Sequence, residues 1–522
     1  MTKRREESDR LRSTRKLPKG SLNLDKRGGK APTAGQQTGQ LNLFFETAEN
    51  PRGDDAGRER GKAASRPSGL PKPENKDGQD WSTMVTLEEV AREENLREAF
   101  RRVKANKGAP GPDRQTISMV EKHLEELLAK LSRSLMEETY EPGLIRRKWL
   151  PKPGGGERGL GIPDVVDRIV GQALDQVLSP LYEPTFHSNS HGFMTGRSCH
   201  TAIAQAVKYL EEGCEIVVDL DLDKFFDRVN RQRLLDRMSQ RVKDRRIVRL
   251  IGKMLNAKVV LPDGVVIETV EGVPQGGPLS PLLSNIVLDE LDWEMDRRGY
   301  RFVRYADDTN VYVASERAGK RVMASVTRFI EKRLRLKVNA SKSAVAKPED
   351  RHFLGFRLRR DPLEGDVEVL LSKRSVERIQ KRIRDLTPRN WGQSLRACLR
   401  GLKAYLNGWI GFFQIVTAGA RRLLAILDAH IRRRLRAILL RQWKTKRTIA
   451  RRLIRLGVSK TTVWRLLHTG RKSWWALSHA PAVDRGLRNA YFAERGLVSL
   501  AVRWDELNPS FHVPQQPALP LG

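Results

Sequence analysis

The sequence predicts an α+β amino-terminal part followed by a part made only of helices. Two observations carry this prediction. Short β-branched and apolar runs, such as Ile216 to Leu220 and the runs on either side of residues 305–308, alternate with helical patterns up to about residue 372. After Ser372 the apolar residues recur only at helical spacing.

The elements follow in order along the chain. Residues 1–80 are rich in Gly, Pro, Ser and charge and contain no Trp or Tyr, so we expect them to be disordered. Folded structure is expected to begin near Trp81. Helices are expected at 117–135, 164–182, 201–212, 231–255, 282–297 and 317–334, and strands at 216–221, 258–269, 300–314 and 353–359.

The composition favours a polyanion as partner. The chain has 97 Lys+Arg against 63 Asp+Glu, a net charge of +34, which promotes salt-dependent binding to nucleic acid. Charge alone is equally compatible with a ribosomal or a chromatin protein. With 522 residues and 39% hydrophobic residues, the chain is long enough for two to four domains with real cores.

The cysteines and the hydropathy indicate a reducing, aqueous compartment. Cys199, Cys214 and Cys398 show no C-x-x-C spacing, so neither a structural zinc site nor a disulfide framework is expected. No run of 18 apolar residues occurs, and the first residues lack the apolar core of a signal peptide. We therefore expect a cytoplasmic protein without a membrane partner.

Three carboxylates are candidates for a metal site. Asp307 and Asp308 lie in Tyr305-Ala306-Asp307-Asp308, between two strand-like runs, and Asp221 ends the run that begins at Ile216. Adjacent carboxylates repel unless a proton or a cation relieves them. On spacing alone, Asp219 and Asp223 are alternatives to Asp221.

A loop punctuated by Pro and Gly, Gly272-Val273-Pro274-Gln275-Gly276-Gly277-Pro278, lies between the two acidic sites. In this order, the acids, the bulky Phe226 and the Pro-Gln-Gly loop resemble a reverse transcriptase of the retroelement kind. The resemblance implies a right-hand polymerase fold. Its fingers and palm mix helices with an antiparallel sheet, and an all-helical thumb and a small helical DNA-binding domain follow.

The resemblance assigns catalysis and metal binding to Asp221, Asp307 and Asp308. The implied cofactor is two Mg²⁺ ions, for which Mn²⁺ can substitute, and hard carboxylate oxygens suit these ions. Two divalent ions about 3.5–4 Å apart can activate a primer 3′-hydroxyl and neutralise a leaving pyrophosphate.

The same resemblance predicts contacts to the incoming dNTP. Phe226 stands where the family carries a ring that excludes the 2′-hydroxyl of ribonucleotides, and Gln275 would hydrogen-bond the nucleotide. Lys152 and Arg158 flank a glycine turn that resembles the family's fingertip hairpin and would contact the triphosphate.

Further motifs indicate the group II intron branch of the family. Asn106 to Asp113, His191 to Ser198, Phe353 to Phe356 and Gly401 to Trp409 resemble an amino-terminal extension, a fingers block, a palm strand and the maturase thumb, or domain X. The chain departs from the family in the fingers. His191 replaces a usual Tyr, Met194-Thr195 replace Arg-Pro, and Gly159 replaces Pro, which affects the expected grip on template and intron RNA.

Nucleic-acid contacts are expected in the carboxyl-terminal part. Residues 431–455 hold eleven Lys or Arg and no acid, and a merely solvated face normally mixes signs. The predicted contacts are Arg197 in the fingers and Arg432, Arg433, Arg434, Arg436, Lys444, Lys446 and Arg447. Trp443, Trp464, Trp474 and Trp475 could either stack on bases or pack a helical core.

The sequence thus predicts a group II intron-encoded reverse transcriptase and maturase. Relatives with an endonuclease carry paired Cys and His after the DNA-binding domain; none is seen here, so we expect the type that does not nick DNA. The expected regions are a basic extension at 1–80, fingers and palm at 81–365, thumb at 366–445, a DNA-binding domain at 446–510 and a tail at 511–522.

Such a protein would bind its intron RNA, assist splicing, and copy the intron into cDNA at target DNA from dNTPs. It would associate with the nucleoid of a bacterial cell, and whether it forms a homodimer is open. Two alternatives are a reverse transcriptase recruited to host defence or repair, and a splicing-only RNA-binding protein with a vestigial polymerase site.

Overall fold

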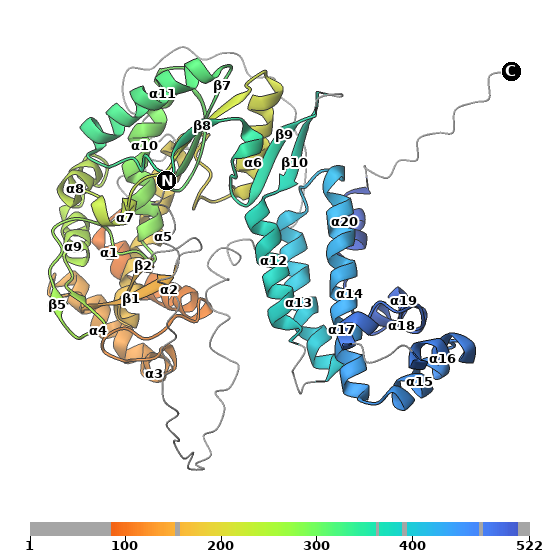
Figure 1. Cartoon of the computed structure of the whole chain (residues 1–522). Coiled ribbons are helices and arrows are strands. Elements are labelled where there is room, and N and C mark those ends of the chain that lie inside the picture. The colour runs from red at the N-terminus through yellow and green to blue at the C-terminus, as the bar shows by residue number, and fades with distance from the viewer. Residues whose placement is uncertain (1–84, 152–156, 362–364, 389–393, 469–472, 510–522) are drawn as a thin grey trace, which may run out of the picture. The chain divides into compact units, whose positions relative to one another are not determined.

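The structure is a computed structural model that describes residues 85–151, 157–361, 365–388, 394–468 and 473–509 (Figure 1). The predicted extension at 1–80, the tail at 511–522 and Lys152 lie outside the described residues. Among the described residues, no helix combines the length and apolarity needed to cross a lipid bilayer.

The first helices form the base of the fingers. They are α1 (Leu87–Ala91), α2 (Glu93–Ala105), α3 (Ile117–Lys122), α4 (Leu124–Met136) and α5 (Val165–Tyr182). The single helix expected at 117–135 is two helices, because His123 leaves helical geometry with φ −121° and ψ 30°. Both pieces still contribute apolar residues to one core with α5.

A four-stranded sheet extends from these helices. Its strands are β1 (Ile145–Pro151), β2 (Glu157–Ile162), β4 (Val259–Val260) and β5 (Val266–Ile267), in the order β2-β1-β4-β5. The pair β1–β2 is the expected antiparallel hairpin, with Leu150 opposite Arg158. The strand expected at 258–269 is the short hairpin β4–β5.

The second sheet has the order β6-β7-β3-β8 and is antiparallel throughout. Its strands are β3 (Ile216–Leu220), β6 (Arg301–Tyr305), β7 (Asp308–Val313) and β8 (Ala344–Ala346). Side chains alternate between its faces. One face, with Val218, Leu220, Phe302 and Val311, joins the core of the fingers helices. The other, with Val217, Val303 and Tyr312, joins a second core that extends into the helices after residue 372.

Helices cover both faces of this sheet. Helix α6 (Cys199–Glu211) packs on the face toward the second core, and α10 (Ser280–Arg297) and α11 (Glu316–Phe329) pack on the other. Helix α11 is continued by a π-helical turn (Ile330–Leu334). Helices α7 (Phe225–Arg228), α8 (Arg231–Ser239) and α9 (Arg245–Leu255) join the core that α10 and α11 share. The helix expected at 231–255 is interrupted because Asp244 caps a new helix through its side chain, which accepts from the Arg246 amide.

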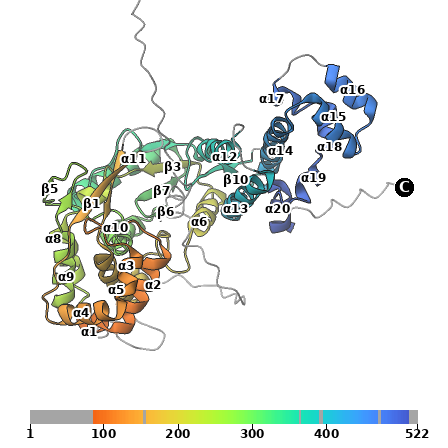
Figure 2. The ribbon, with the colours of Figure 1, turned by 90° about the horizontal axis from the view of Figure 1, so that it is seen from below.

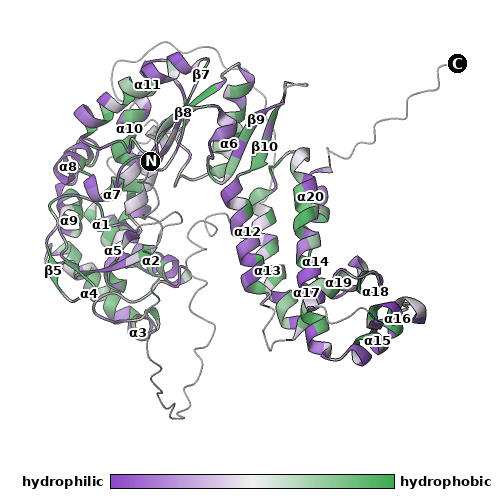
Figure 3. Cartoon of the chain, viewed as in Figure 1, coloured by the Kyte–Doolittle hydropathy of each residue, from purple (hydrophilic) through white to green (hydrophobic). Residues whose placement is uncertain are grey.

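The described residues after β9 (Phe356–Arg360) and β10 (Val367–Leu371) are helical, as expected, although β10 was not predicted. Three long helices are α12 (Lys373–Leu386), α13 (Leu395–Phe413) and α14 (Arg421–Trp443), along which polar and apolar residues alternate (Figure 3). Six shorter helices follow: α15 (Lys446–Arg455), α16 (Lys460–His468), α17 (Trp474–Leu477), α18 (Pro481–Gly486), α19 (Asn489–Ala493) and α20 (Leu500–Leu507). Helices α15, α16 and α18 pack together (Figure 2).

Candidate functional site

The three predicted acids lie at one end of the β6-β7-β3-β8 sheet. Asp219 pairs with Asn310 and Leu220 with Thr309, so one more step in the register places Asp221 opposite Asp308. Tyr305 pairs with Asp308, which leaves Ala306 and Asp307 as a two-residue hairpin loop. The sheet therefore brings Asp221, Asp307 and Asp308 together from segments more than 80 residues apart.

The hairpin loop is held in an unfavourable conformation by its surroundings. Ala306 is buried with φ 56°, a left-handed geometry that costs a residue with a Cβ about 1–2 kcal/mol. Arg304 Nη1 donates to the Ala306 carbonyl at 2.9 Å, and Gly192 lies so close that a Cβ there would come within 2.4 Å of the Ala306 nitrogen. Strain of this kind, fixed by packing, is typical of functional sites.

Burial and neighbouring charges raise the pKa of the two hairpin acids, Asp307 and Asp308. Asp308 keeps one side open to solvent, but desolvation by the surrounding protein is the largest cause that raises its pKa to about 7, followed by the charges of Asp307, Asp219 and Asp221. Desolvation and the charge of Asp221 also raise the pKa of Asp307. The Lys342 ammonium acts in the opposite direction on both groups. The site therefore favours a cation or a proton.

Asp221 carries an oxygen suited to a cation. Its Oδ2 is buried and makes no hydrogen bond to any described residue, and it forms an ion pair with Lys342 Nζ at 3.5 Å. Across the described residues, however, no three Asp, Glu, His or Cys side chains converge closely enough to form a complete metal site. The donor chemistry thus fits a hard divalent ion, and side chains must still rearrange for all three carboxylates to share one.

Both alternatives to Asp221 are engaged by arginines. Arg351 donates through Nε to Asp219 Oδ2 at 2.8 Å, and Arg228 Nη2 lies 2.9 Å from Asp223 Oδ2. A carboxylate that is already charge-paired is a poorer metal ligand, because binding the ion must first break the pair. Among the acids of this segment, the geometry favours Asp221.

The predicted dNTP contacts are linked to one another through the backbone. Phe225 is buried and Phe226 half-buried, and the two rings meet edge to face at 5.1 Å. The Phe226 carbonyl accepts from the Val273 amide at 2.7 Å, so the ring is joined to the Pro-Gln-Gly loop. The carbonyl of the half-buried Gln275 accepts from Gly161 at 2.8 Å, which ties that loop to β2.

Gly276 permits this approach, because it has φ 116° and any Cβ would lie 2.9 Å from the Gly161 oxygen. Half-buried Arg158 lies on the same strand, and Lys152 is outside the described residues.

The departures from the family in the fingers have structural partners. His191 Nδ1 lies 2.9 Å from Thr201 Oγ1, and burial, followed by the charges of Arg197 and Arg304, lowers its pKa to about 4. Arg197 Nη1 donates to the His187 carbonyl at 2.6 Å, to Ser190 and, weakly, to the sulfur of buried Met194. Arg197 is therefore occupied within the protein, which argues for a role in holding this loop.

The other two substitutions are also accommodated. The Thr195 amide donates to Glu183 at 3.2 Å. Gly159 leaves space for the side chain of Arg147, which donates to its carbonyl at 3.1 Å.

The predicted basic contacts divide into buried and exposed groups. Arg434 donates to the Thr387 carbonyl at 2.7 Å, and Arg436 donates to the Leu487 carbonyl and pairs with Asp484. Both arginines are buried, so their surroundings favour a structural role. Lys444 and Arg447 are exposed, whereas Arg432, Arg433 and Lys446 are half-buried.

The tryptophans divide in the same way. Trp443 is buried, and Trp474 packs against the second core. The Arg433 guanidinium lies 4.2 Å from the centre of the Trp475 ring. Trp464 is 56% exposed, so it is the tryptophan best placed to stack on a base.

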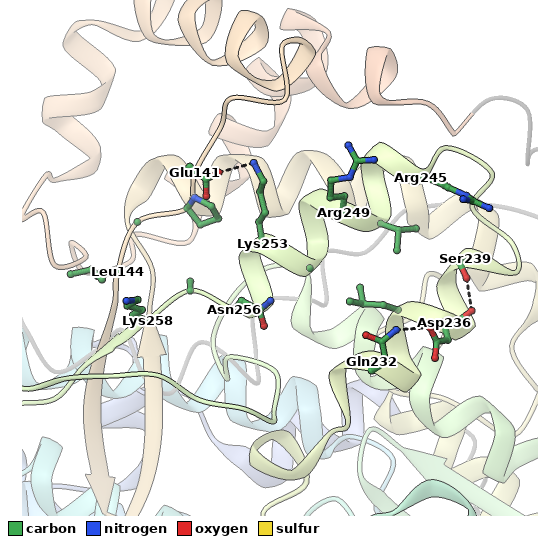
Figure 4. A pocket seen from close by; sticks show the side chains of 16 residues that line it. Glu141, Leu144, Gln232, Asp236, Ser239, Arg245, Arg249, Lys253, Asn256 and Lys258 are labelled. Carbon is green, nitrogen blue, oxygen red and sulfur yellow. Dashed lines mark hydrogen bonds and ion pairs between the residues drawn. The ribbon is translucent and has the colours of Figure 1, made fainter.

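A groove of about 940 Å³ lies between α8, α9 and the segment before β1 (Figure 4). None of the predicted site residues lines it. Two of its cations are paired, because Lys253 lies 2.7 Å from Glu141 and Arg249 contacts Glu138. Its charge is thus largely compensated locally, and it is separate from the acidic site.

Sequence reasoning missed the residues that position the hairpin. Arg304 and Asp292 form a fully buried pair, and Arg304 also donates to Asn285 and Ser190. Lys342 beside Asp221 was missed as well. A cation inside a strand-like run is the one sequence feature that could have indicated Arg304.

Comparison with known proteins gives the family. Residues 150–358 match the family described as reverse transcriptase (RNA-dependent DNA polymerase), and residues 376–457 match the group II intron, maturase-specific domain. The chain is 31% identical to Protein YkfC of Escherichia coli over 323 residues, covering 54% of this chain and 84% of that protein.

Two further relatives are covered less completely. The group II intron-encoded protein LtrA of Lactococcus lactis is 38% identical over 169 residues, 32% of this chain and 28% of LtrA. The putative COX1/OXI3 intron 2 protein of Saccharomyces cerevisiae is 27% identical over 333 residues, 53% of this chain and 39% of that protein.

Membership of a reverse transcriptase family implies dependence on a divalent metal, and the maturase-specific domain implies nucleic-acid substrates that include intron RNA. The chain therefore belongs to the group II intron reverse transcriptases with a maturase domain, and its palm is that of an RNA-directed DNA polymerase.

Proposed function

We propose that Asp221, Asp307 and Asp308 hold two Mg²⁺ ions, replaceable by Mn²⁺, for RNA-templated DNA synthesis. The observation that carries this proposal is the buried, unbonded Oδ2 of Asp221 beside two carboxylates of raised pKa. Bound divalent ions would lower the pKa of the primer hydroxyl and neutralise charge on the departing pyrophosphate.

The surrounding residues select and orient the nucleotide. Phe226, which is half-buried, would press against the sugar and exclude a 2′-hydroxyl. The loop that carries Gln275 is fixed against β2 through the Gly161 amide, so its side chain is presented from a rigid support. Arg158, together with Lys152, contributes positive charge for the triphosphate.

The nucleic-acid partners are the group II intron RNA and the target DNA. Exposed Lys444 and Arg447, with half-buried Arg432, Arg433 and Lys446, support phosphate contacts along α14 and α15. In this proposal the protein stabilises its intron RNA for splicing and copies it into cDNA, in the bacterial cytoplasm and near the nucleoid. A homodimer is one of the assemblies in which it could act.

A coupled splicing and cDNA assay tests the proposal. Purified protein is mixed with a precursor RNA that carries the group II intron found in the flanking DNA, with Mg²⁺ and dNTPs. The wild type is expected to give both spliced RNA and cDNA. Asp307→Asn should keep splicing and lose cDNA by at least about 10²-fold. Absence of wild-type cDNA would contradict the polymerase role, and loss of splicing in Asp307→Asn would contradict the separation of the two roles.

A further inference from the structure

A short turn is bound to the backbone of Asp221. The Asn339 amide donates to the Asp221 carbonyl at 2.8 Å, and the Asp221 amide donates to Ser343 Oγ at 3.0 Å. The Lys342 and Ser343 amides both donate to the Asn339 carbonyl, which closes the turn. The backbone of the turn that holds Lys342 is therefore fixed against Asp221, although the two residues are 121 positions apart in the sequence.

Arg351 secures this turn from its other side. Its Nε donates to Asp219 at 2.8 Å, and its Nη2 donates to the Lys342 carbonyl at 2.7 Å. Strand β8 continues from the turn and pairs Ala344 with Asp219. The residues on both sides of Lys342 are thus bound to the segment that carries the acid, Asn339 and Ser343 to Asp221, and Ala344 to Asp219.

The side chain of Lys342, in contrast, is free to move. It is 59% exposed, and within the described part of the chain its only ion pair is to Asp221 Oδ2, at 3.5 Å, longer than a hydrogen bond. That oxygen is buried and has no hydrogen-bond partner among the described residues. A lysine provides a compact charge on a flexible stem, and it can leave a carboxylate more readily than a bidentate arginine.

We infer that Lys342 is the built-in counter-cation of the acidic site, which neutralises Asp221 while no divalent ion is bound and withdraws when one binds. The inference rests on the proposed metal role of Asp221. It has two consequences. Lys342 stabilises the metal-free protein by offsetting repulsion among the carboxylates, and it weakens metal affinity because the ion must displace it.

The lowering effect of Lys342 on the pKa of Asp307 and Asp308 agrees with this position, since the ammonium acts on all three acids. A matched control exists in the same segment. Lys347 is exposed and follows β8 at the far end, where Ala346 pairs with Val217. In this register Lys347 lies opposite Ile216, five residues before Asp221, so about 17 Å of strand separate it from the level of Asp221, beyond the Debye length of about 8–10 Å.

Binding of Mn²⁺ to the full-length protein without nucleic acid tests the inference. Free Mn²⁺ is measured by electron paramagnetic resonance for wild type, Lys342→Met, Lys342→Arg, Lys347→Met and Asp221→Asn. Lys342→Met should bind Mn²⁺ about ten-fold more tightly, whereas Lys342→Arg should bind no more tightly than wild type. Lys347→Met should change affinity by less than about two-fold.

Thermal unfolding gives a second readout. In EDTA, Lys342→Met should unfold at a lower temperature than wild type, and saturating Mn²⁺ should remove the difference. If Asp221→Asn loses binding while Lys342→Met binds Mn²⁺ no better than wild type, the counter-cation role is overturned and the metal site stands. If Asp221→Asn binds as wild type does, the metal role of Asp221 is overturned, and this inference with it.

Discussion

Arg304 and Asp292 form an ion pair in which neither side chain has any exposed surface, with Arg304 Nε 2.7 Å from Asp292 Oδ1. Arg304 lies on β6, two residues before Ala306, and Asp292 lies on the buried side of α10. The same guanidinium donates to the Ala306 carbonyl. The pair therefore connects the stability of the palm to the conformation of the Asp307-Asp308 hairpin.

Removing one partner of this pair should unfold the palm more easily. Asp292→Ala leaves a buried, unpaired guanidinium and should reduce the free energy of unfolding by about 3–5 kcal/mol. The double variant Arg304→Met/Asp292→Leu should recover much of that loss, yet synthesise little DNA because Ala306 loses its donor. Urea denaturation and primer extension measure the two effects. A double variant with wild-type activity would show that Arg304 does not position the hairpin.

Phe226 and Phe225 provide a test of sugar selection. Phe226→Val opens space beside the nucleotide, so incorporation of ribonucleotides relative to deoxynucleotides should rise by about ten-fold or more. Phe225→Val, at the buried neighbour, should lower the melting temperature without changing that ratio. Single-nucleotide incorporation kinetics with dNTP and rNTP decide the outcome, and an unchanged ratio in Phe226→Val would remove its role as a gate.

The basic residues of α14 and α15 should separate into two classes. Lys444→Ala and Arg447→Ala should weaken RNA binding, and each should reduce the slope of log K against log[salt] by about 0.7–0.9. Arg434→Ala should instead lower stability, because its hydrogen bonds to Thr387 are buried. Fluorescence anisotropy of labelled RNA from 50 to 300 mM salt measures the binding and its salt slope, and thermal unfolding measures the stability of each variant. Equal salt slopes for all the variants would contradict the division into two classes.

The amino-terminal motif should make stability depend on pH. The Asp113 amide donates to Asp164 at 3.1 Å, and burial, followed by the hydrogen bond shared with the Asp113 carboxyl, raises the pKa of Asp164 from 3.8 to about 6. Between these values the folded protein binds more protons than the unfolded chain, so this group's contribution to stability falls as pH rises from about 4 to 6.

Asp164→Asn cannot titrate, so its stability relative to wild type should increase with pH over that interval. Urea denaturation of both proteins at pH 5 and pH 7 measures the difference. If the free energies of unfolding of the two proteins differ by the same amount at both pH values, the raised pKa of Asp164 does not contribute to stability.

Local sequence patterns predicted the helices and strands better than the tertiary contacts between them. The β-branched, apolar run ending at Asp221 and the 305–308 hairpin were predictable, because composition and order along the chain indicate them. The interruptions at His123 and Asp244 were not, since continuous apolar periodicity hides a change in helix direction. Strand β8 is three residues long and carries no strong β-pattern.

Side-chain environments were the hardest to predict. The basic run 431–455 predicted a surface that contacts nucleic acid, yet α14 is buried on all sides from Arg434 to Leu440. Arginines there are satisfied by carbonyls that lie about 50 residues away in the sequence. Lys342 approaches Asp221 only because β8 pairs with β3, a contact that no local pattern encodes.

The most direct measurement is primer extension on poly(rA)/oligo(dT) with dTTP and Mg²⁺, comparing wild type with three single variants. Asp221→Asn and Asp307→Asn should each lower the rate by at least about 10²-fold. Asp223→Asn, which removes a neighbouring carboxylate paired with Arg228, should keep most of the activity. No incorporation by the wild type, or an equal loss in Asp223→Asn, would contradict the assignment of the metal site to Asp221, Asp307 and Asp308.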